Sequence, residues 1–203
     1  MALLPEGEYR YEKRRHGEVI ETEEVLFAAG MIRGIRRSAD SANSLKVDAA
    51  LDEDSTVKRV RISYSRGFFK RDAFYETAEE TLRGSVSAMA GRNEIIVKLG
   101  RLREIGADLT LFRALLLARV RARGALQWTG RVAVIDAATL VAASRKESCR
   151  AIDGSGLRWV YEARMGDSET IALDSEGRLT ERRASDGAFT RLCGFIPQES
   201  SSS

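Results

Sequence analysis

Apolar and polar residues alternate along most of this 203-residue chain. The clearest example is residues 157–165, LRWVYEARM, where Trp159 and Tyr161 share one side and mostly charged residues take the other. A period of two places successive side chains on opposite faces of a β-strand, so each such segment predicts a strand with one buried face. The other segments with this pattern are 9–11, 45–51, 60–64, 82–88, 95–99, 126–128, 132–134, 171–173 and 189–193.

Glycine and aspartate turns separate these segments, as at His16-Gly17, Arg66-Gly67 and Ser175-Glu176-Gly177. Many short strands joined by such turns predict a mainly β fold, in which a curved antiparallel sheet forms a β-roll or a barrel. We expect a single β-rich domain over residues 1–197 and a disordered polar tail over residues 198–203.

One segment breaks the alternation, residues 106–124 with the sequence GADLTLFRALLLARVRARG. It predicts a central helix over 108–122, with Asp108 as the N-cap and Gly124 ending the last turn. Fifteen helical residues span only about 23 Å, which is too short for a membrane core. We expect the helix to pack on the concave side of the sheet. The sequence leaves open whether the helix fills the interior as core or forms the wall of a cavity.

Two parts of the chain are similar to each other. Residues 57–76 and 155–174 each contain an alternating segment, a glycine turn and a second strand-like segment. This predicts two similar halves, 1–105 and 124–197, joined by the helix. The alternative is that any two β-hairpins look alike in this way.

The residues that enzymes and metal sites usually need are scarce. The chain has one histidine, His16, in a turn, and two cysteines, Cys149 and Cys193. That set does not supply a Ser-His-Asp arrangement or a four-ligand zinc site, and glycine-rich phosphate-binding motifs are missing. We therefore predict no catalytic residue, no metal and no cofactor, and expect the protein not to be an enzyme.

A pair of carboxylates offers another interpretation. Glu21 and Glu23 are two residues apart, so on a strand they share a face with Val19 and Val25. Facing inward, they would be buried carboxylates with raised pKa values, suited to acid–base chemistry. Facing outward, they would protect an exposed edge strand from aggregation. We favour the exposed edge strand.

Charge and the first residues bear on partners and location. The net charge is only +3, so we expect no nucleic-acid partner, although arginines surround Tyr64 in residues 59–71. The start, MALLPEGEYRYEKRR, lacks the pattern of a secretory leader, and no apolar stretch approaches 20 residues. These features predict a cytoplasmic protein with reduced thiols and no integral membrane association.

Aromatic residues on the apolar faces point to a binding interior. Tyrosine and tryptophan offer an apolar wall with a polar group, a common lining of small-molecule pockets. The alternative for each is ordinary core packing. The predicted ligand-binding residues are Tyr9, Tyr11, Tyr64, Phe112, Leu116, Trp128, Trp159 and Tyr161.

Residues 7–27, GEYRYEKRRHGEVIETEEVLF, and 173–183, LDSEGRLTERR, carry a resemblance to known proteins. In this strand–turn–strand pattern the chain resembles uncharacterised bacterial β-roll or half-barrel proteins, among them glycolipid-binding and lipoprotein-carrier-like ones. The resemblance implies the β-roll architecture. The inward aromatic residues, the single apolar helix and the lack of catalytic residues predict that the protein binds a hydrophobic or amphipathic small molecule, such as a lipid or glycolipid, without catalysis. The alternative function is a structural or protein-interaction module with a solid core, with formation of a homodimer.

Overall fold

The computed structural model describes residues 3–40, 42–88, 91–99, 103–107, 109–164 and 167–198. Within these residues the chain forms one helix, α1 (Thr110–Ala122), and fifteen strands of a single sheet. The strands are β1 (Gly7–Arg15), β2 (Glu18–Ala28), β3 (Met31–Ser38), β4 (Asn43–Leu51), β5 (Val57–Arg66), β6 (Phe69–Ala78), β7 (Thr81–Ala88), β8 (Gly91–Lys98), β9 (Arg103–Ala107), β10 (Gln127–Ile135), β11 (Ala142–Ala151), β12 (Arg158–Arg164), β13 (Asp167–Leu173), β14 (Leu179–Ala184) and β15 (Phe189–Pro197).

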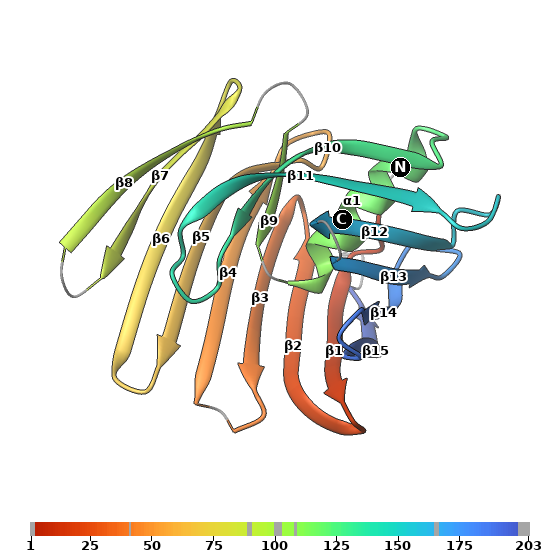
Figure 1. Cartoon of the computed structure of the whole chain (residues 1–203), viewed down its shortest axis with the longest axis horizontal. Coiled ribbons are helices and arrows are strands. Elements are labelled where there is room, and N and C mark those ends of the chain that lie inside the picture. Colours follow the sequence, from red (N-terminus) through yellow and green to blue (C-terminus); the bar gives the residue numbers. More distant parts are fainter. Residues whose placement is uncertain are drawn as a thin grey trace.

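The strand order is β8-β7-β6-β5-β4-β3-β2-β1-β15-β14-β13-β12-β11-β10-β9. Each strand from β1 to β8 and from β10 to β15 pairs antiparallel with its neighbour along the chain, whereas β9 pairs parallel with β10. Strand β1 also pairs with β15, so the first and last strands lie side by side in the middle of the sheet (Figure 1). The two edges of the sheet are therefore β8 and β9.

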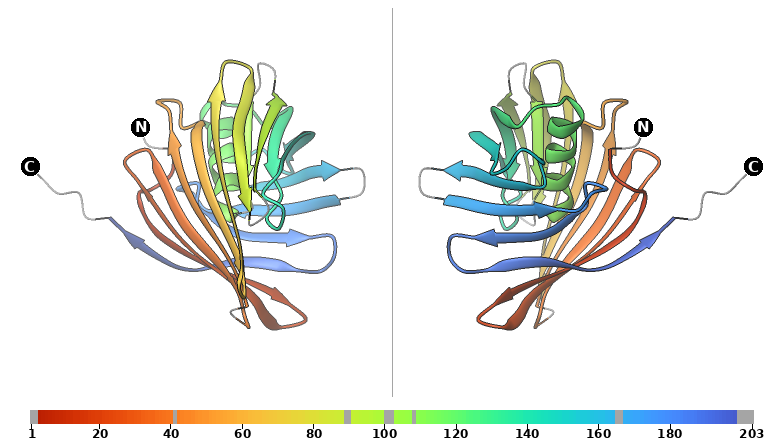
Figure 2. Two further views of the ribbon diagram at one scale, coloured as in Figure 1. Left: turned by 90° about the vertical axis from the view of Figure 1, so that its left-hand side faces the viewer. Right: turned by 90° about the vertical axis from the view of Figure 1, so that its right-hand side faces the viewer.

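The sheet curls around α1, which lies on its concave side (Figure 2). The fold class predicted from the alternation, a curved, mainly β structure with one helix, is confirmed. Trp159 and Tyr161 are fully buried, as the sequence predicts, and so are Tyr9 and Tyr11. The two segments that look alike form the hairpins β5–β6 and β12–β13. Their origin in a duplicated unit stays a prediction.

Helix α1 is buried over ten of its thirteen residues, which confirms that the apolar segment packs inside the sheet. It begins at Thr110; the predicted N-cap, Asp108, lies outside the described residues. Gly124, at a φ of +68°, follows the last turn, and its N–H bonds to the Arg121 carbonyl. A glycine there avoids the steric cost of the left-handed conformation and ends the helix as expected.

The turn between β10 and β11 closes over the distant strand β6. The Tyr75 hydroxyl donates to the Leu140 carbonyl at 2.6 Å and accepts from the Ala142 N–H at 3.2 Å. Arg71 of β6 donates to the Ala138 carbonyl at 2.7 Å. Leu140 is fully buried although its φ is +59°, so the turn enters the interior. Side chains thus join parts of the curled sheet that no strand pairing connects.

Two predicted apolar faces are wrong. At the start of β15, the buried residues are Ala188, which immediately precedes the strand, and Thr190 within it, whereas Cys193 is exposed. The sequence prediction placed the bulky Phe189 on the buried face. It was wrong because the residues that do face inward are small or polar. Leu126, predicted to face inward, is also exposed.

Candidate binding site

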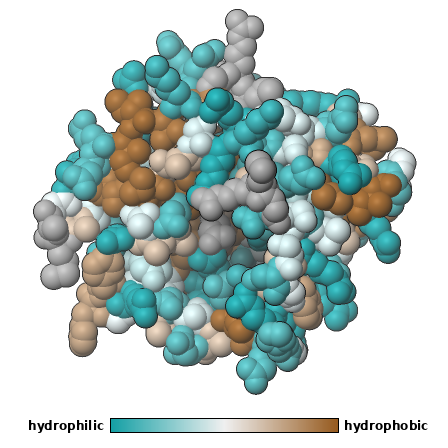
Figure 3. Space-filling model, in the orientation of Figure 1, coloured by the Kyte–Doolittle hydropathy of each residue, from teal (hydrophilic) through white to brown (hydrophobic). Residues whose placement is uncertain are grey.

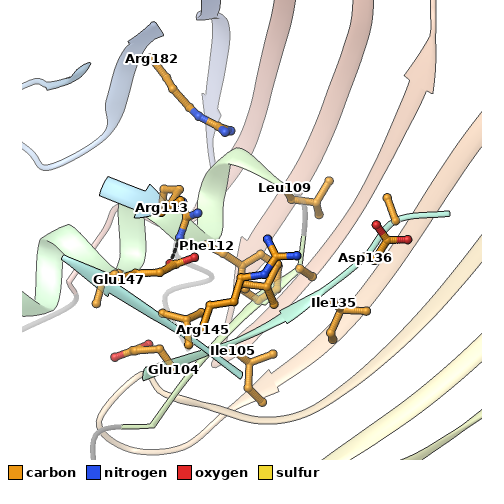
Figure 4. A pocket seen from close by; sticks show the side chains of 17 residues that line it. Glu104, Ile105, Leu109, Phe112, Arg113, Ile135, Asp136, Arg145, Glu147 and Arg182 are labelled. Atoms are coloured by element: carbon orange, nitrogen blue, oxygen red, sulfur yellow. Dashed lines mark hydrogen bonds and ion pairs between the residues drawn. The ribbon is translucent and has the colours of Figure 1, made fainter. Parts of the chain in front are cut away.

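A cavity of about 260 Å³ lies between α1 and strands β9, β10 and β11 (Figure 4). The helix and these strands face each other here because α1 follows β9 in the chain and β10 follows α1. The lining residues are Glu104, Ile105, Gly106, Ala107, Leu109, Phe112, Arg113, Leu116, Val132, Val134, Ile135, Asp136, Ala137, Arg145, Glu147, Ala163 and Arg182.

The helix provides much of the apolar wall of this cavity. The spacing of three and four residues places Leu109, Phe112 and Leu116 on one helical face. Leu109 is the residue immediately before α1. Gly106 of β9 contributes no side chain; a Cβ there would stand 3.4 Å from Val132 Cγ1. Phe112 and Leu116 were predicted to contact a ligand, and both line this cavity.

A buried polar cluster stands beside the apolar part of the cavity. Arg113 Nη1 donates to Glu147 Oε2 at 3.0 Å and also to the Tyr161 hydroxyl, which itself donates to Glu147 Oε2. The Arg113 guanidinium lies over the Tyr161 ring, 3.9 Å from its centroid. Burial raises the pKa of Tyr161 well above its ordinary value, so the phenol stays protonated and keeps donating. The cluster links α1, β11 and β12.

Two further arginines enter the same space from other strands. Arg145 extends from β11 and Arg182 from β14 toward the cavity (Figure 4). Arg182 forms a forked pair with Glu169, with Nε donating at 2.9 Å and Nη2 at 2.5 Å. The cavity therefore combines an apolar wall with cationic side chains.

Glu23 is buried, so its assignment to an exposed edge strand is wrong. Strand β2 pairs on both sides, with β1 and β3, and only 7% of Glu23 is exposed. Its carboxylate accepts the Thr110 N–H at 2.9 Å and the Thr110 hydroxyl at 3.0 Å. These bonds cap the start of α1 from a distant strand. Glu21 is half-buried and pairs with Lys13 at 3.1 Å.

The other predicted ligand-binding residues lie outside this cavity. Tyr9, Tyr11, Trp159 and Tyr161 are closely packed, with 0% or 1% of each exposed. The Trp159 indole N–H donates to the Gly156 carbonyl at 2.8 Å. The ring centroids of Tyr9 and Phe195 are 4.9 Å apart. Tyr64 and Trp128 are half-buried at the edge of the core.

Sequence reasoning missed the charged residues of the site, Glu104, Arg113, Arg145, Glu147 and Arg182. For Arg113, the signal in the sequence was the position of an arginine among the apolar residues of the predicted helix. Arg145 and Glu147 alternate with the buried Cys149 along β11, which is a pattern of charges on an inward face. Burial raises the pKa of the Cys149 thiol to about 12, so this thiol is a core residue rather than a nucleophile.

Solved structures with similar folds were found by comparison. A DUF1089 family protein from Pseudomonas aeruginosa aligns with a TM-score of 0.59 and 12% identity, over 88% of this chain and 91% of that one. A beta-barrel-like protein of DUF1849 from Brucella abortus aligns with a TM-score of 0.58 and 11% identity, over 97% and 98% of the two chains. The likeness is one of fold. No protein-family model and no curated protein matches the sequence.

Among the described residues, no cluster of three or more histidine, cysteine, aspartate or glutamate side chains could hold a metal ion. No helix among them combines the length and apolar character needed to cross a membrane. His16 lies in the β1–β2 turn with a φ of +52°.

Proposed function

We propose that the protein binds a small hydrophobic or amphipathic molecule, of lipid or glycolipid type, in the cavity between α1 and β9–β11, and does not catalyse a reaction on it. The observation that carries this proposal is the cavity itself, in which an apolar wall faces arginine side chains. Apolar pockets with a few convergent polar groups are typical small-molecule sites. Fold likeness to barrel-like proteins is consistent with such a pocket, but it does not by itself give a function.

The volume limits the size of the ligand. Small-molecule pockets usually measure about 300–1,000 Å³, so a cavity of about 260 Å³ suits a short chain such as that of octan-1-ol rather than a complete diacyl lipid. The ligand is therefore a small amphiphile or one segment of a larger lipid.

The buried ionisable groups support binding rather than catalysis. Glu23 caps α1, Glu104 pairs with Arg119, and Glu147 accepts from Arg113 and Tyr161. Each of these carboxylates already has a structural partner. A general base needs an oxygen free to reach a substrate proton. Among these three carboxylates, Glu147 Oε1 is buried without a hydrogen-bond partner, but Glu147 Oε2 is held by both Arg113 and Tyr161, which fixes this carboxylate as part of the cavity wall.

The proposal is tested by filling the cavity. In Gly106→Leu, the new side chain extends from β9 into the space beside Val132, which reduces the volume for a ligand. We expect octan-1-ol to shift the amide NMR signals of cavity residues in the wild-type protein and to do so weakly in Gly106→Leu. The matched control is Gly154→Leu, because a Cβ at Gly154 meets no atom within 4 Å.

Two results would overturn the proposal. One is that octan-1-ol causes no shifts at cavity residues in the wild-type protein. The other is that Gly106→Leu, shown to be folded by its thermal unfolding, binds the probe as well as Gly154→Leu does.

The alternative, an interaction module that forms a homodimer, has support on the surface. Strand β8 is a sheet edge, and edges can pair with another chain. Ile96 on this strand is 67% exposed, and apolar areas lie over the β6–β8 side in Figure 3. Light scattering after size exclusion tests this function: a dimer that Ile96→Lys dissociates supports it, and a monomer at high concentration excludes it.

A further inference from the structure

Among the described residues, most charged groups around the cavity form ion pairs, and Arg145 does not. Arg113 pairs with Glu147, Arg182 with Glu169, and Glu104 with Arg119. Arg145 has neither an ion pair nor a hydrogen bond to any residue that the structure describes. An arginine that is only half-exposed gains from a counter-charge, because partial burial removes part of its hydration.

The other acidic residue at the cavity, Asp136, is committed to its own turn. Its Oδ1 accepts the N–H groups of Ala138 and Thr139, at 3.1 Å and 2.7 Å, and the Thr139 hydroxyl at 2.8 Å. Asp136 therefore organises the β10–β11 turn, and its carboxylate is not a hydrogen-bonding partner of Arg145.

The position of Arg145 on β11 is inward. It is two residues from the buried Glu147, on the same face of the strand, whereas Lys146 between them is exposed. Figure 4 shows its side chain extending from β11 into the space bordered by Phe112 and Leu109 of the helical wall. The guanidinium N–H donors of Arg145 thus lie beside the apolar part of the cavity.

We propose that Arg145 recognises the acidic head group of the ligand, so that the ligand is an amphipathic carboxylate whose chain lies on the apolar wall. This inference rests on the proposed function, because it assigns the ligand class of the same cavity. A guanidinium binds a carboxylate through two parallel hydrogen bonds, which are stronger than neutral ones. The Arg113–Glu147 pair beside it leaves little net charge, so Arg145 supplies the attraction for an anion.

The experiment compares octanoate with octan-1-ol, which share a chain and differ in the charged head group. Binding is followed by amide NMR shifts in the wild-type protein, Arg145→Met and Lys146→Met. Lys146→Met is the matched control because it removes one positive charge from the exposed face of the same strand. We expect the wild-type protein and Lys146→Met to bind octanoate about tenfold more tightly than octan-1-ol, or better.

In Arg145→Met we expect this preference to disappear, with octanoate weakened about tenfold or more and octan-1-ol unchanged. A second measurement needs no variant: octanoate should shift the Arg145 side-chain Nε–H signal in the wild-type protein, and octan-1-ol should not.

The outcomes separate this inference from the proposed function. If octan-1-ol binds at the cavity but Arg145→Met keeps the preference for octanoate, the role of Arg145 is wrong and the proposed function stands. If the two probes bind equally well to the wild-type protein, the ligand class is wrong. If neither probe binds, the proposed function fails, and this inference with it.

Discussion

Glu23 shows at the scale of one residue how the sheet holds the helix. The carboxylate is buried, and burial raises its pKa above the ordinary value of 4.5. The two hydrogen bonds from Thr110 and the charges of Arg36 and Arg182 oppose this rise without cancelling it. The folded state therefore binds the Glu23 proton more tightly than the unfolded state does.

A dependence on pH follows from this shift. Where the folded state binds more protons, the free energy of unfolding falls as pH rises. The contribution of Glu23 is fully present below about pH 4.5 and is lost as pH rises through its raised folded-state pKa. Glu23→Gln cannot ionise but can still accept the Thr110 N–H. We expect the stability of wild type relative to Glu23→Gln to decrease with rising pH above 4.5.

Urea denaturation of both proteins between about pH 4 and pH 8 measures this difference. Subtracting the two free energies of unfolding removes the contributions of all other titrating groups, which the two proteins share. A difference that stays constant over this range would show that Glu23 has the same proton affinity in the folded and unfolded states.

At the scale of elements, α1 is fixed to β9 by an ion pair with little access to water. Arg119 and Glu104 form this pair, and their side chains are only 6% and 14% exposed. Arg119 also donates to the Ser55 carbonyl at the β4–β5 turn. The pair therefore joins the helix to two separate parts of the sheet.

Removing one partner leaves the other charge buried. Arg119→Met isolates the Glu104 carboxylate, and we expect this to lower the free energy of unfolding by about 3–5 kcal/mol. The double variant Arg119→Met, Glu104→Leu removes both charges, and we expect it to recover at least half of that loss. Chemical denaturation provides the comparison. A double variant no more stable than the single one would mean that the loss comes from packing or from the Ser55 contact.

The sequence predicted the elements with strong apolar patterns and missed those with polar inward faces. The strand containing Trp159 and Tyr161 and the apolar helix were recognised because burial selects bulky apolar residues there. Strand β11 was missed because its inward positions include Arg145 and Glu147, whose placement depends on a cavity formed by distant segments. Local patterns do not encode those partners.

Strand β3 was missed for a different reason. It places Gly34 under the start of the helix, where a Cβ would lie 2.7 Å from Leu109 Cδ1. A larger residue here would displace the Leu109 side chain, and the glycine interrupts the apolar alternation of the strand. The candidate site was therefore predicted only in its apolar part, Phe112 and Leu116, whose binding role stays a prediction.

At the scale of the whole molecule, the strands nearest the two chain termini pair with each other inside the sheet, whereas the two edge strands come from the middle of the chain. Gly7 of β1 pairs with Pro197 of β15, and the Gln198 N–H bonds to the Glu6 carbonyl at 3.1 Å. By contrast, β8 and β9, which follow each other in sequence, form the two edges of the sheet. The covalent ends of the chain and the structural ends of the sheet are thus in different places.

A circular permutant tests this description. A Gly/Ser linker of about eight residues spans roughly 16 Å, enough to join Gln198 to Leu3 while Leu4 keeps its buried place. New termini between Leu99 and Arg103 interrupt no strand pairing, because the sheet has its edges there. We expect this permutant to unfold in one cooperative transition, with a free energy within about 1–2 kcal/mol of wild type.

The control permutant opens between Val47 and Asp48, in the middle of β4. This cut interrupts pairings with both β3 and β5, so we expect no cooperative unfolding. Urea denaturation followed by tryptophan fluorescence reports on both proteins, since Trp159 is buried in the core. If the permutant opened at Leu99–Arg103 also lost its transition, the covalent link from β8 through β9 to α1 would be what places the helix inside the sheet. Retention of the transition would instead mean that packing places the helix, through Glu23, Arg119 and the apolar face of α1.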